Sequence, residues 1–166
     1  MLPELLFTPF TKAEQGAHDE NISPQQGNVL VSRRGAVREN SQVSLQLYTT
    51  AAEYALSSGV ILADTKFEFG LISSQDGSKQ LVLIDEVLTP DSSRYWPLAR
   101  YTQGKSQPSF DKQYLRDWLV SAGFMKGLES GSEGKEGQGW TIDEDIVRGT
   151  RDRYSEAVEP LTGSKA

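Results

Sequence analysis

Residues 60–87, VILADTKFEFGLISSQDGSKQLVLIDEV, decide which fold class the sequence predicts. Val60–Leu62 is a short apolar strand, and residues from Asp64 to Leu71 alternate between polar and apolar, the period of a strand. Asp76-Gly77 tolerates the positive φ angles of a tight hairpin turn. Residues 80–87 are rich in Leu, Val and Ile, as expected of the returning strand. We therefore expect an antiparallel hairpin.

Helices are expected on both sides of this hairpin, over residues 41–58, 111–122 and 141–161. Their apolar residues recur at the three- and four-residue spacing of a core-facing stripe. The expected N-caps are Asn40 or Ser41, Ser109 and Thr141, and the expected helix stops are Gly59, Pro160 and Gly163. Residues 89–109 should form a loop, and residues 127–139 a flexible Gly-rich loop. An antiparallel hairpin flanked by helices is an α+β fold.

The composition limits the classes of function. The chain has 166 residues, no Cys, and 17 Lys+Arg against 23 Asp+Glu, a net charge of −6. An acidic chain is a poor binder of nucleic acid polymers or anionic membranes, and a chain without Cys has neither a thiolate zinc site nor a cysteine nucleophile. The mean hydropathy is −0.48. The first ten residues lack the pattern of a signal peptide, so a cytoplasmic protein is expected.

The hairpin also predicts a site. A turn centred on Asp76-Gly77 places Glu68 opposite Asp85. Cross-strand partners have Cβ atoms about 5 Å apart, so the two carboxylates need a shared proton or a bound cation. In a site of oxygen ligands the favoured cation is Mg²⁺. The alternative is a solvated polar face, and a slip of one residue would turn Asp85 to the other face.

The segment after the hairpin, DEVLTPDSSRYW (residues 85–96), gathers acids, hydroxyls and an arginine. Asp91, Ser92, Ser93 and Arg94 suit a phosphorylated polyhydroxy ligand, because the guanidinium fork matches a phosphate. A Pro-Asp-Ser turn with a surface Arg is an equally good interpretation.

Five segments carry a family resemblance: LADTKFEFG (62–70), FTPFTKAEQGAHDENIS (7–23), IDEVLTPDSSRYWP (84–97), SQPSFDKQYLRDWL (106–119) and RYSEAVEPLTG (153–163). The first of them resembles the Asp-x-Lys-x-Glu-Phe-Gly signature of the SAICAR synthetase family. Together they resemble its fungal branch. Nearly the whole chain is covered, apart from the Gly-rich loop.

The resemblance implies a reaction. Members of the family join L-aspartate to the carboxylate of a phosphoribosyl aminoimidazole (CAIR), giving SAICAR in de novo purine biosynthesis. They use ATP and Mg²⁺, through an acyl-phosphate intermediate. The implied partners are these small molecules, with no nucleic acid polymer and no membrane, and the full-length enzyme is expected to be a cytoplasmic monomer.

The resemblance also implies roles for residues. The metal would be held by Glu68 and Asp85, and the nucleotide phosphates by Lys12 and Lys66 with that pair. The residues implied for catalysis are Lys66, Asp64 and Asp19. The residues implied for substrate binding are Lys12, Asp64, Asp91, Arg94 and Lys112.

Some features depart from the family. Members are about twice as long, and the N-terminal nucleotide-binding sheet domain and an Arg-bearing signature are absent from this sequence. Residues 1–166 are thus expected to be a partial SAICAR synthetase domain: the second, substrate- and phosphate-binding part with the C-terminal helices. The alternative is a truncated, catalytically incompetent chain that acts at most as a binding module. An exposed apolar patch is expected at Phe7, Phe10 and the neighbouring sheet face, and Phe10 stands where the family implies a small residue.

Overall fold

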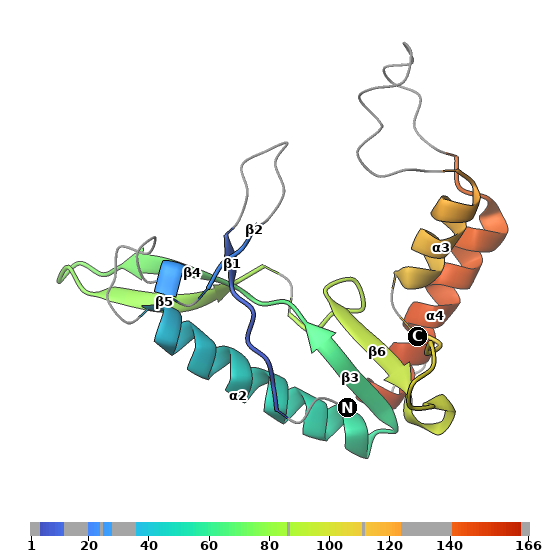
Figure 1. Cartoon of the computed structure of the whole chain (residues 1–166), viewed down its shortest axis with the longest axis horizontal. Helices are drawn as coiled ribbons and strands as arrows, with labels where there is room; N and C mark the ends of the chain where they lie inside the picture. Colours follow the sequence, from blue (N-terminus) through green and yellow to red (C-terminus); the bar gives the residue numbers. More distant parts are fainter. Residues whose placement is uncertain are drawn as a thin grey trace, which may run out of the picture. The chain divides into compact units, whose positions relative to one another are not determined.

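The computed structural model describes residues 4–11, 20–23, 25–27, 36–85, 87–110, 112–123 and 141–163. The chain divides into two compact units: residues 1–52 with 66–87, and residues 53–65 with 88–166. In the described part, strands pair in twos, all antiparallel, and helices accompany them (Figure 1). The α+β fold class is confirmed. The expected loop at 127–139 lies outside the described residues.

The predicted hairpin forms in the first unit from β4 (Glu68–Ser73) and β5 (Lys79–Ile84). The predicted register is wrong by one residue, because Glu68 pairs with Ile84 and not with Asp85. The cause is the turn. Ser74 N–H donates to the Ser78 carbonyl at 2.8 Å, which leaves a three-residue loop in which Gly77 takes a left-handed φ of 81°.

One face of this hairpin carries two exposed isoleucines. Ile72 and Ile84 lie on the same side of the strand pair and are 51% and 44% exposed. Phe7 and Phe10, which were expected in an exposed patch, are half-buried. The sheet-face part of that prediction is therefore confirmed, and the phenylalanine part is wrong.

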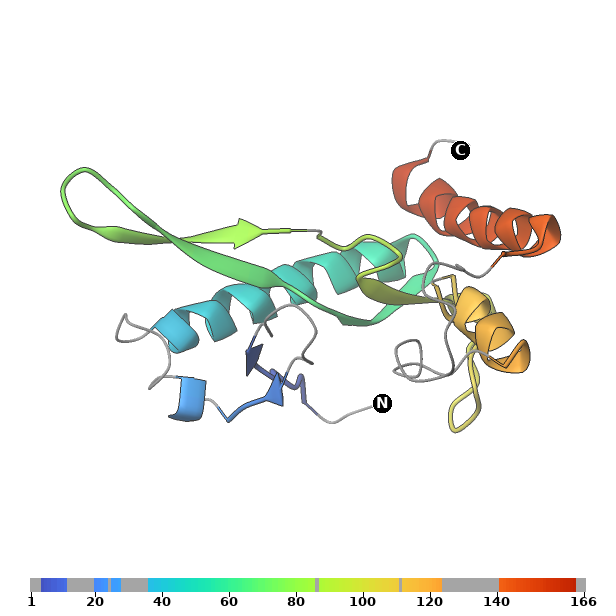
Figure 2. The same ribbon diagram turned by 90° about the horizontal axis from the view of Figure 1, so that it is seen from above.

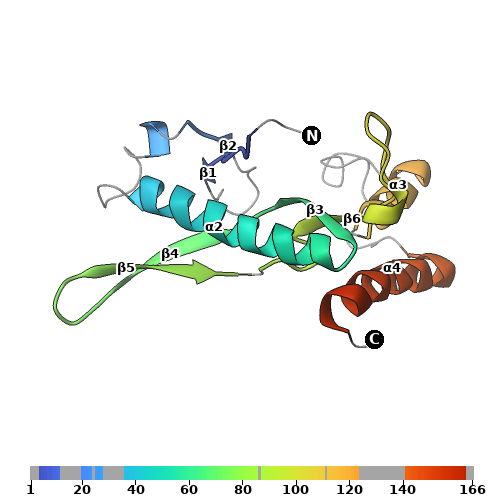
Figure 3. The same ribbon diagram turned by 90° about the horizontal axis from the view of Figure 1, so that it is seen from below.

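The first unit also contains most of α2 (Ala36–Ser57) and the short strands β1 (Phe10–Thr11) and β2 (Glu20–Asn21). Figures 1 and 3 show the first half of α2 running beside the hairpin. The helix begins five residues earlier than predicted. Asn40 is consequently inside it, where its Oδ1 accepts from the Ser44 hydroxyl at 3.0 Å instead of capping the first turn.

In the second unit, β3 (Val60–Thr65) pairs with β6 (Ser93–Pro97). The prediction of a loop over residues 89–109 is wrong, since this segment contains β6 and the 3₁₀ helix η1 (Leu98–Arg100). The prediction of one strand from Asp64 to Leu71 is also wrong. The chain leaves β3 after Thr65 and enters β4 at Glu68, and the two strands have different partners.

Two helices complete the second unit, α3 (Gln113–Ser121) and α4 (Glu144–Thr162), which lie side by side (Figure 2). Their contact is close because Gly149 has no side chain: a Cβ there would lie 2.8 Å from the Tyr114 ring. Arg153 completes the contact, with its guanidinium 4.2 Å from the centre of that ring.

The cap predictions have mixed outcomes. The N-caps of α3 and α4 are Lys112 and Asp143, without side-chain cap bonds, so the predictions of Ser109 and Thr141 are wrong. Pro160 lies inside the last turn of α4. The predicted stops at Gly59 and Gly163 are confirmed, with left-handed φ angles of 78° and 68°.

In the described part of the chain, no helix combines the length and apolar character needed to cross a membrane.

Candidate functional site

The residues predicted for the site fall into separate groups in the structure. Lys66, Glu68 and Asp85 belong to the first unit. The second unit carries Asp64, Asp91, Arg94 and Lys112. Lys12 and Asp19 lie outside the described residues, as do Glu86 and Asp111. Each group is described by itself.

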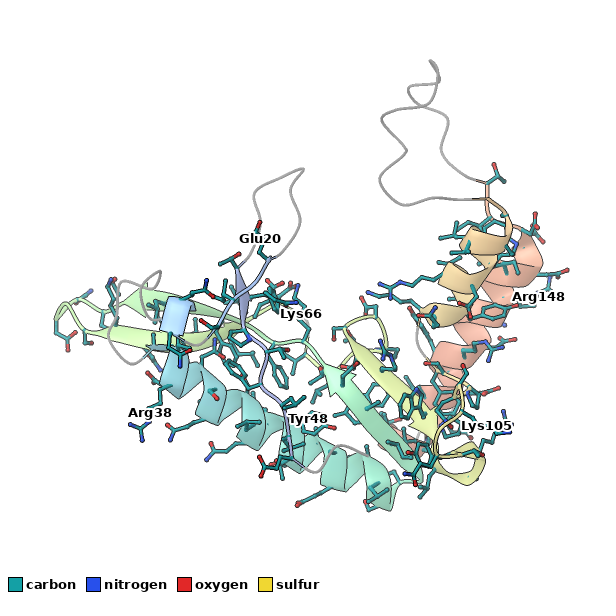
Figure 4. All side chains as sticks on the ribbon, viewed as in Figure 1. Glu20, Arg38, Tyr48, Lys66, Lys105 and Arg148 are labelled. Atoms are coloured by element: carbon teal, nitrogen blue, oxygen red, sulfur yellow. The ribbon has the colours of Figure 1, made fainter. Side chains whose placement is uncertain are left out.

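In the first unit, Lys66 and Glu68 form an ion pair. Lys66 Nζ lies 2.7 Å from Glu68 Oε1. The Glu68 side chain is only 11% exposed, whereas that of Lys66 is 43% exposed. Lys66 lies on the link that enters β4, beside the β1–β2 pair (Figure 4). There its ammonium also lies 4.9 Å from the centre of the Phe10 ring. We call Phe10, Lys66 and Glu68 the Lys66 cluster.

Asp85 follows the last residue of β5 and has a left-handed backbone, with a φ of 69°. This conformation breaks the alternation of faces along the strand, and Asp is among the few residues that tolerate it. The predicted pairing of Asp85 with Glu68 is therefore wrong as a register, and a metal role for Asp85 stays a prediction. The described residues contain no group of three or more His, Cys, Asp or Glu side chains placed to hold a metal ion.

In the second unit, Asp64 and Arg94 form an ion pair across β3 and β6. Their Cα atoms are register partners, and Arg94 Nη1 lies 3.2 Å from Asp64 Oδ2. The register shifts between Leu62 and Asp64, so a bulge sets which β6 residue Asp64 faces. Both side chains are about half exposed (58% and 47%), so solvent screens the pair and a ligand can reach it.

A run of hydroxyls lies next to this ion pair. Thr65 Oγ1 and Ser93 Oγ share a hydrogen bond of 2.7 Å, and Thr89 Oγ1 and Ser92 Oγ share one of 3.1 Å. Ser93 is only 5% exposed. Ser92 and Ser93 also donate their N–H groups to the Thr89 carbonyl, which closes the turn that contains Asp91. Sequence reasoning missed Thr65, because its role depends on pairing with the strand β6 that was not predicted.

Tyr95 anchors the same strand from inside. It is 4% exposed, and its hydroxyl donates to the Leu88 carbonyl at 2.7 Å. Burial raises the pKa of Tyr95, because the phenolate would be poorly solvated there. Leu88 has a left-handed φ of 61°, an uncommon conformation for a residue with a side chain. The segment before Arg94 is thus held in one shape by buried contacts.

Lys112 is the N-cap residue of α3 and is half-buried. Its carbonyl accepts the Arg116 N–H at 3.1 Å, which is the ordinary start of a helix. A substrate contact by Lys112 stays a prediction.

The two ion pairs are suited to related chemistry. Each combines a carboxylate with a cationic side chain, and each is accessible to solvent on at least one side. An ammonium and a guanidinium can bind phosphoryl oxygens. A carboxylate such as Glu68 can also bind a cation that takes its other ligands from phosphates and water.

A family model described as SAICAR synthetase matches residues 1–130. The chain belongs to the SAICAR synthetase family. Curated relatives named phosphoribosylaminoimidazole-succinocarboxamide synthase match almost all of it. The Pichia angusta protein is 53% identical over 158 residues, which is 95% of this chain and 47% of the relative. The Saccharomyces cerevisiae protein is 48% identical over 163 residues, 98% of this chain and 49% of the relative.

Solved structures of SAICAR synthetases agree with the fold. One described as SAICAR-synthase from Saccharomyces cerevisiae complexed with SAICAR is 44% identical, with a TM-score of 0.70. That match covers 89% of this chain and 44% of the solved chain. The Pyrococcus horikoshii SAICAR synthetase, at 24% identity and a TM-score of 0.65, supports the fold alone. The chain spans about half the length of the curated relatives it matches.

Proposed function

We propose that this chain takes part in the ATP-dependent ligation of L-aspartate to the carboxylate of CAIR, which yields SAICAR in purine biosynthesis. The observation that carries the proposal is the 44% identity to a Saccharomyces cerevisiae SAICAR synthase whose structure contains SAICAR. The residue roles below are part of the proposal.

The first step is phosphoryl transfer. A carboxylate oxygen of CAIR attacks the γ-phosphorus of ATP, the bond to the β-phosphate oxygen breaks, and ADP leaves. Charge develops on the phosphoryl oxygens, so the enzyme contributes mainly positioning and electrostatic stabilisation. Lys66, whose side chain is 43% exposed and paired with Glu68, is the residue we assign to these oxygens. Lys12 and Asp19 are assigned to the nucleotide and to catalysis by resemblance alone.

Mg²⁺ is the metal that the family implies, and the donor set fits it in part. Mg²⁺ is usually bound through one or two carboxylates together with substrate phosphates and waters, and not in an all-protein cage. Glu68 supplies one such carboxylate, and Asp85 is the proposed second. When bound, the ion would neutralise phosphoryl charge.

The second step is acyl transfer. The aspartate amine attacks the acyl carbon, the bond to the phosphate oxygen breaks, inorganic phosphate leaves with its electron pair, and the amine nitrogen loses one proton to water. We assign Arg94 to the ribose phosphate of CAIR and Asp64 to its polar imidazole substituents. The two side chains form an ion pair of 3.2 Å and are both about half exposed, so substrate groups can reach each of them. Asp91 and Lys112 are proposed as further substrate contacts.

The test is SAICAR formation, followed by mass spectrometry after incubation with ATP, Mg²⁺, CAIR and L-aspartate. The chain is assayed alone and together with the other half of a fungal relative. We expect Glu68→Gln to lower kcat by about a hundredfold or more. Glu53→Gln, which changes an exposed carboxylate on α2, should leave it unchanged.

The same experiment decides between enzyme and binding module. SAICAR formation in either arm that Glu68→Gln abolishes supports the proposal. No SAICAR in both arms would contradict it and would favour a chain that binds without turnover. The proposal includes action by a monomer in the cytoplasm, with no nucleic acid polymer or membrane as partner.

A further inference from the structure

We propose that Phe10 is a positioning residue that holds the Lys66 ammonium in place through a cation–π contact. The inference rests on the proposed function for its consequence, because Lys66 is the residue assigned to the nucleotide phosphates. Its geometric part stands on the Lys66 cluster alone. All three residues of that cluster belong to one compact unit.

The geometry is that of a cation over an aromatic face. Lys66 Nζ lies 4.9 Å from the centre of the Phe10 ring, within the distance of about 6 Å at which the ring quadrupole attracts a cation. The same nitrogen lies 2.7 Å from Glu68 Oε1. The Lys66 ammonium is therefore attracted both by the Glu68 carboxylate and by the Phe10 ring. A second cation that binds Glu68 would compete for the carboxylate but not for the ring.

The backbone fixes the ring where it is needed. Phe10 is the first residue of β1 and pairs with Asn21 of β2. The pairing is extended by the Ile22 N–H, which donates to the Pro9 carbonyl at 3.0 Å. Ile22 and Val37, which lies at the start of α2, both approach Gly27. The approach is possible because Gly27 has no side chain: a Cβ there would lie 3.1 Å from Val37 Cγ2. Phe10 is thus tied to the helix through β2.

The consequence concerns what happens when Glu68 binds a cation. A cation held by Glu68 would weaken the attraction between this carboxylate and the Lys66 ammonium, which now lie 2.7 Å apart. The Phe10 ring keeps the ammonium near its resting position, so that less conformational entropy is lost when phosphate oxygens bind. A small residue at this position, as the family resemblance implies, would not provide this contact.

The first experiment tests the geometry by NMR. Protons above an aromatic ring are shifted upfield, so the ε-methylene protons of Lys66, assigned with a Lys66→Arg variant, should be displaced in the unaltered chain. The displacement should persist in Phe10→Tyr and disappear in Phe10→Leu, which keeps an apolar side chain but has no ring. Phe7→Leu, a matched change in the same segment, should leave it intact. An unchanged Lys66 signal in Phe10→Leu would overturn the proposal.

The second experiment tests the consequence, with MgADP as the probe and its Kd as the readout. We expect Phe10→Leu to raise the Kd by about two- to fivefold, the range of an exposed cation–π contact. Phe10→Tyr and Phe7→Leu should stay near the unaltered value. An unchanged Kd in Phe10→Leu, with the NMR displacement lost, would overturn the positioning role. The same titration is made with the other half of a fungal relative present. If the unaltered chain binds no MgADP even then, with the displacement present, the proposed function and the functional part of this inference are refuted.

Discussion

The hydrogen bond between Thr65 and Ser93 gives the sharpest prediction about stability. It joins β3 to β6 at 2.7 Å, and Ser93 is only 5% exposed. The perturbation is a double-mutant cycle made of Ser93→Ala, Thr65→Val and the two together. Both substitutions remove a hydroxyl and keep an apolar side chain of similar size, so that little new strain is introduced.

The magnitude follows from burial. Removing one hydroxyl leaves the other without this hydrogen bond in a site that water reaches poorly. The free energy of unfolding should then fall by about 1–3 kcal/mol. Removing both partners leaves no orphaned group, so the double variant should be less destabilised than the sum of the single variants. We expect a coupling energy of about 1 kcal/mol, within the range measured for residues in contact.

The assay is urea unfolding followed by tryptophan fluorescence. Trp96 lies in β6 and Trp118 in α3, so the signal reports the second unit. With an m-value of about 2 kcal/mol/M, a loss of about 1–3 kcal/mol should lower the midpoint of each single variant by about 0.5–1.5 M. Ser57→Ala, an exposed serine in the same unit, is the control and should stay within about 0.5 kcal/mol. Strictly additive single variants would refute the coupling, and a Ser93→Ala midpoint equal to the control would refute the burial argument.

Three further predictions concern the second unit. Gly149→Ala should destabilise the α3–α4 contact by about 1–3 kcal/mol, because the new Cβ would lie 2.8 Å from the Tyr114 ring. Thermal unfolding measures this loss, and an unchanged Tm would contradict the prediction. Burial raises the pKa of Tyr95 above its ordinary value of 10.0, so the neutral phenol contributes stability that is complete below pH 10 and is lost as the pH rises through the folded-state pKa. An ultraviolet titration should accordingly show a tyrosine that ionises late and is missing in Tyr95→Phe. Arg94→Gln should raise the KM for CAIR at least about tenfold and leave the KM for ATP unchanged, whereas equal effects on both would contradict the assignment of Arg94 to the ribose phosphate.

The local parts of the fold could be predicted from the sequence. Alternating and helical periods identified the hairpin and the three long helices, and glycines at positions 59 and 163 marked two helix ends. These features depend on residues that are close in sequence. For the same reason the Lys66–Glu68 neighbourhood could be recognised from a motif, because both residues lie at one strand entrance.

The remaining features depend on contacts that are distant in sequence. Asp76-Gly77 is compatible with hairpin loops of two or three residues. The loop has three, which shifts the register by one residue, so that Glu68 pairs with Ile84 and not with Asp85. Strand β6 has only five residues and ends at Pro97, so it shows no useful period, and its pairing with β3 was not foreseeable. The Asp64–Arg94 ion pair and the Thr65–Ser93 hydrogen bond depend on that pairing and on the bulge beside it. The Phe10–Lys66 contact likewise joins residues far apart in the chain.

The central claim is that the carboxylate of CAIR is activated by phosphorylation before aspartate attacks. It can be tested with CAIR that carries ¹⁸O in its carboxylate, with the inorganic phosphate analysed by mass spectrometry after turnover. In the acyl-phosphate route one carboxylate oxygen leaves with the phosphate, so each phosphate formed should contain one ¹⁸O atom. Phosphate without ¹⁸O, formed together with SAICAR, would contradict the account.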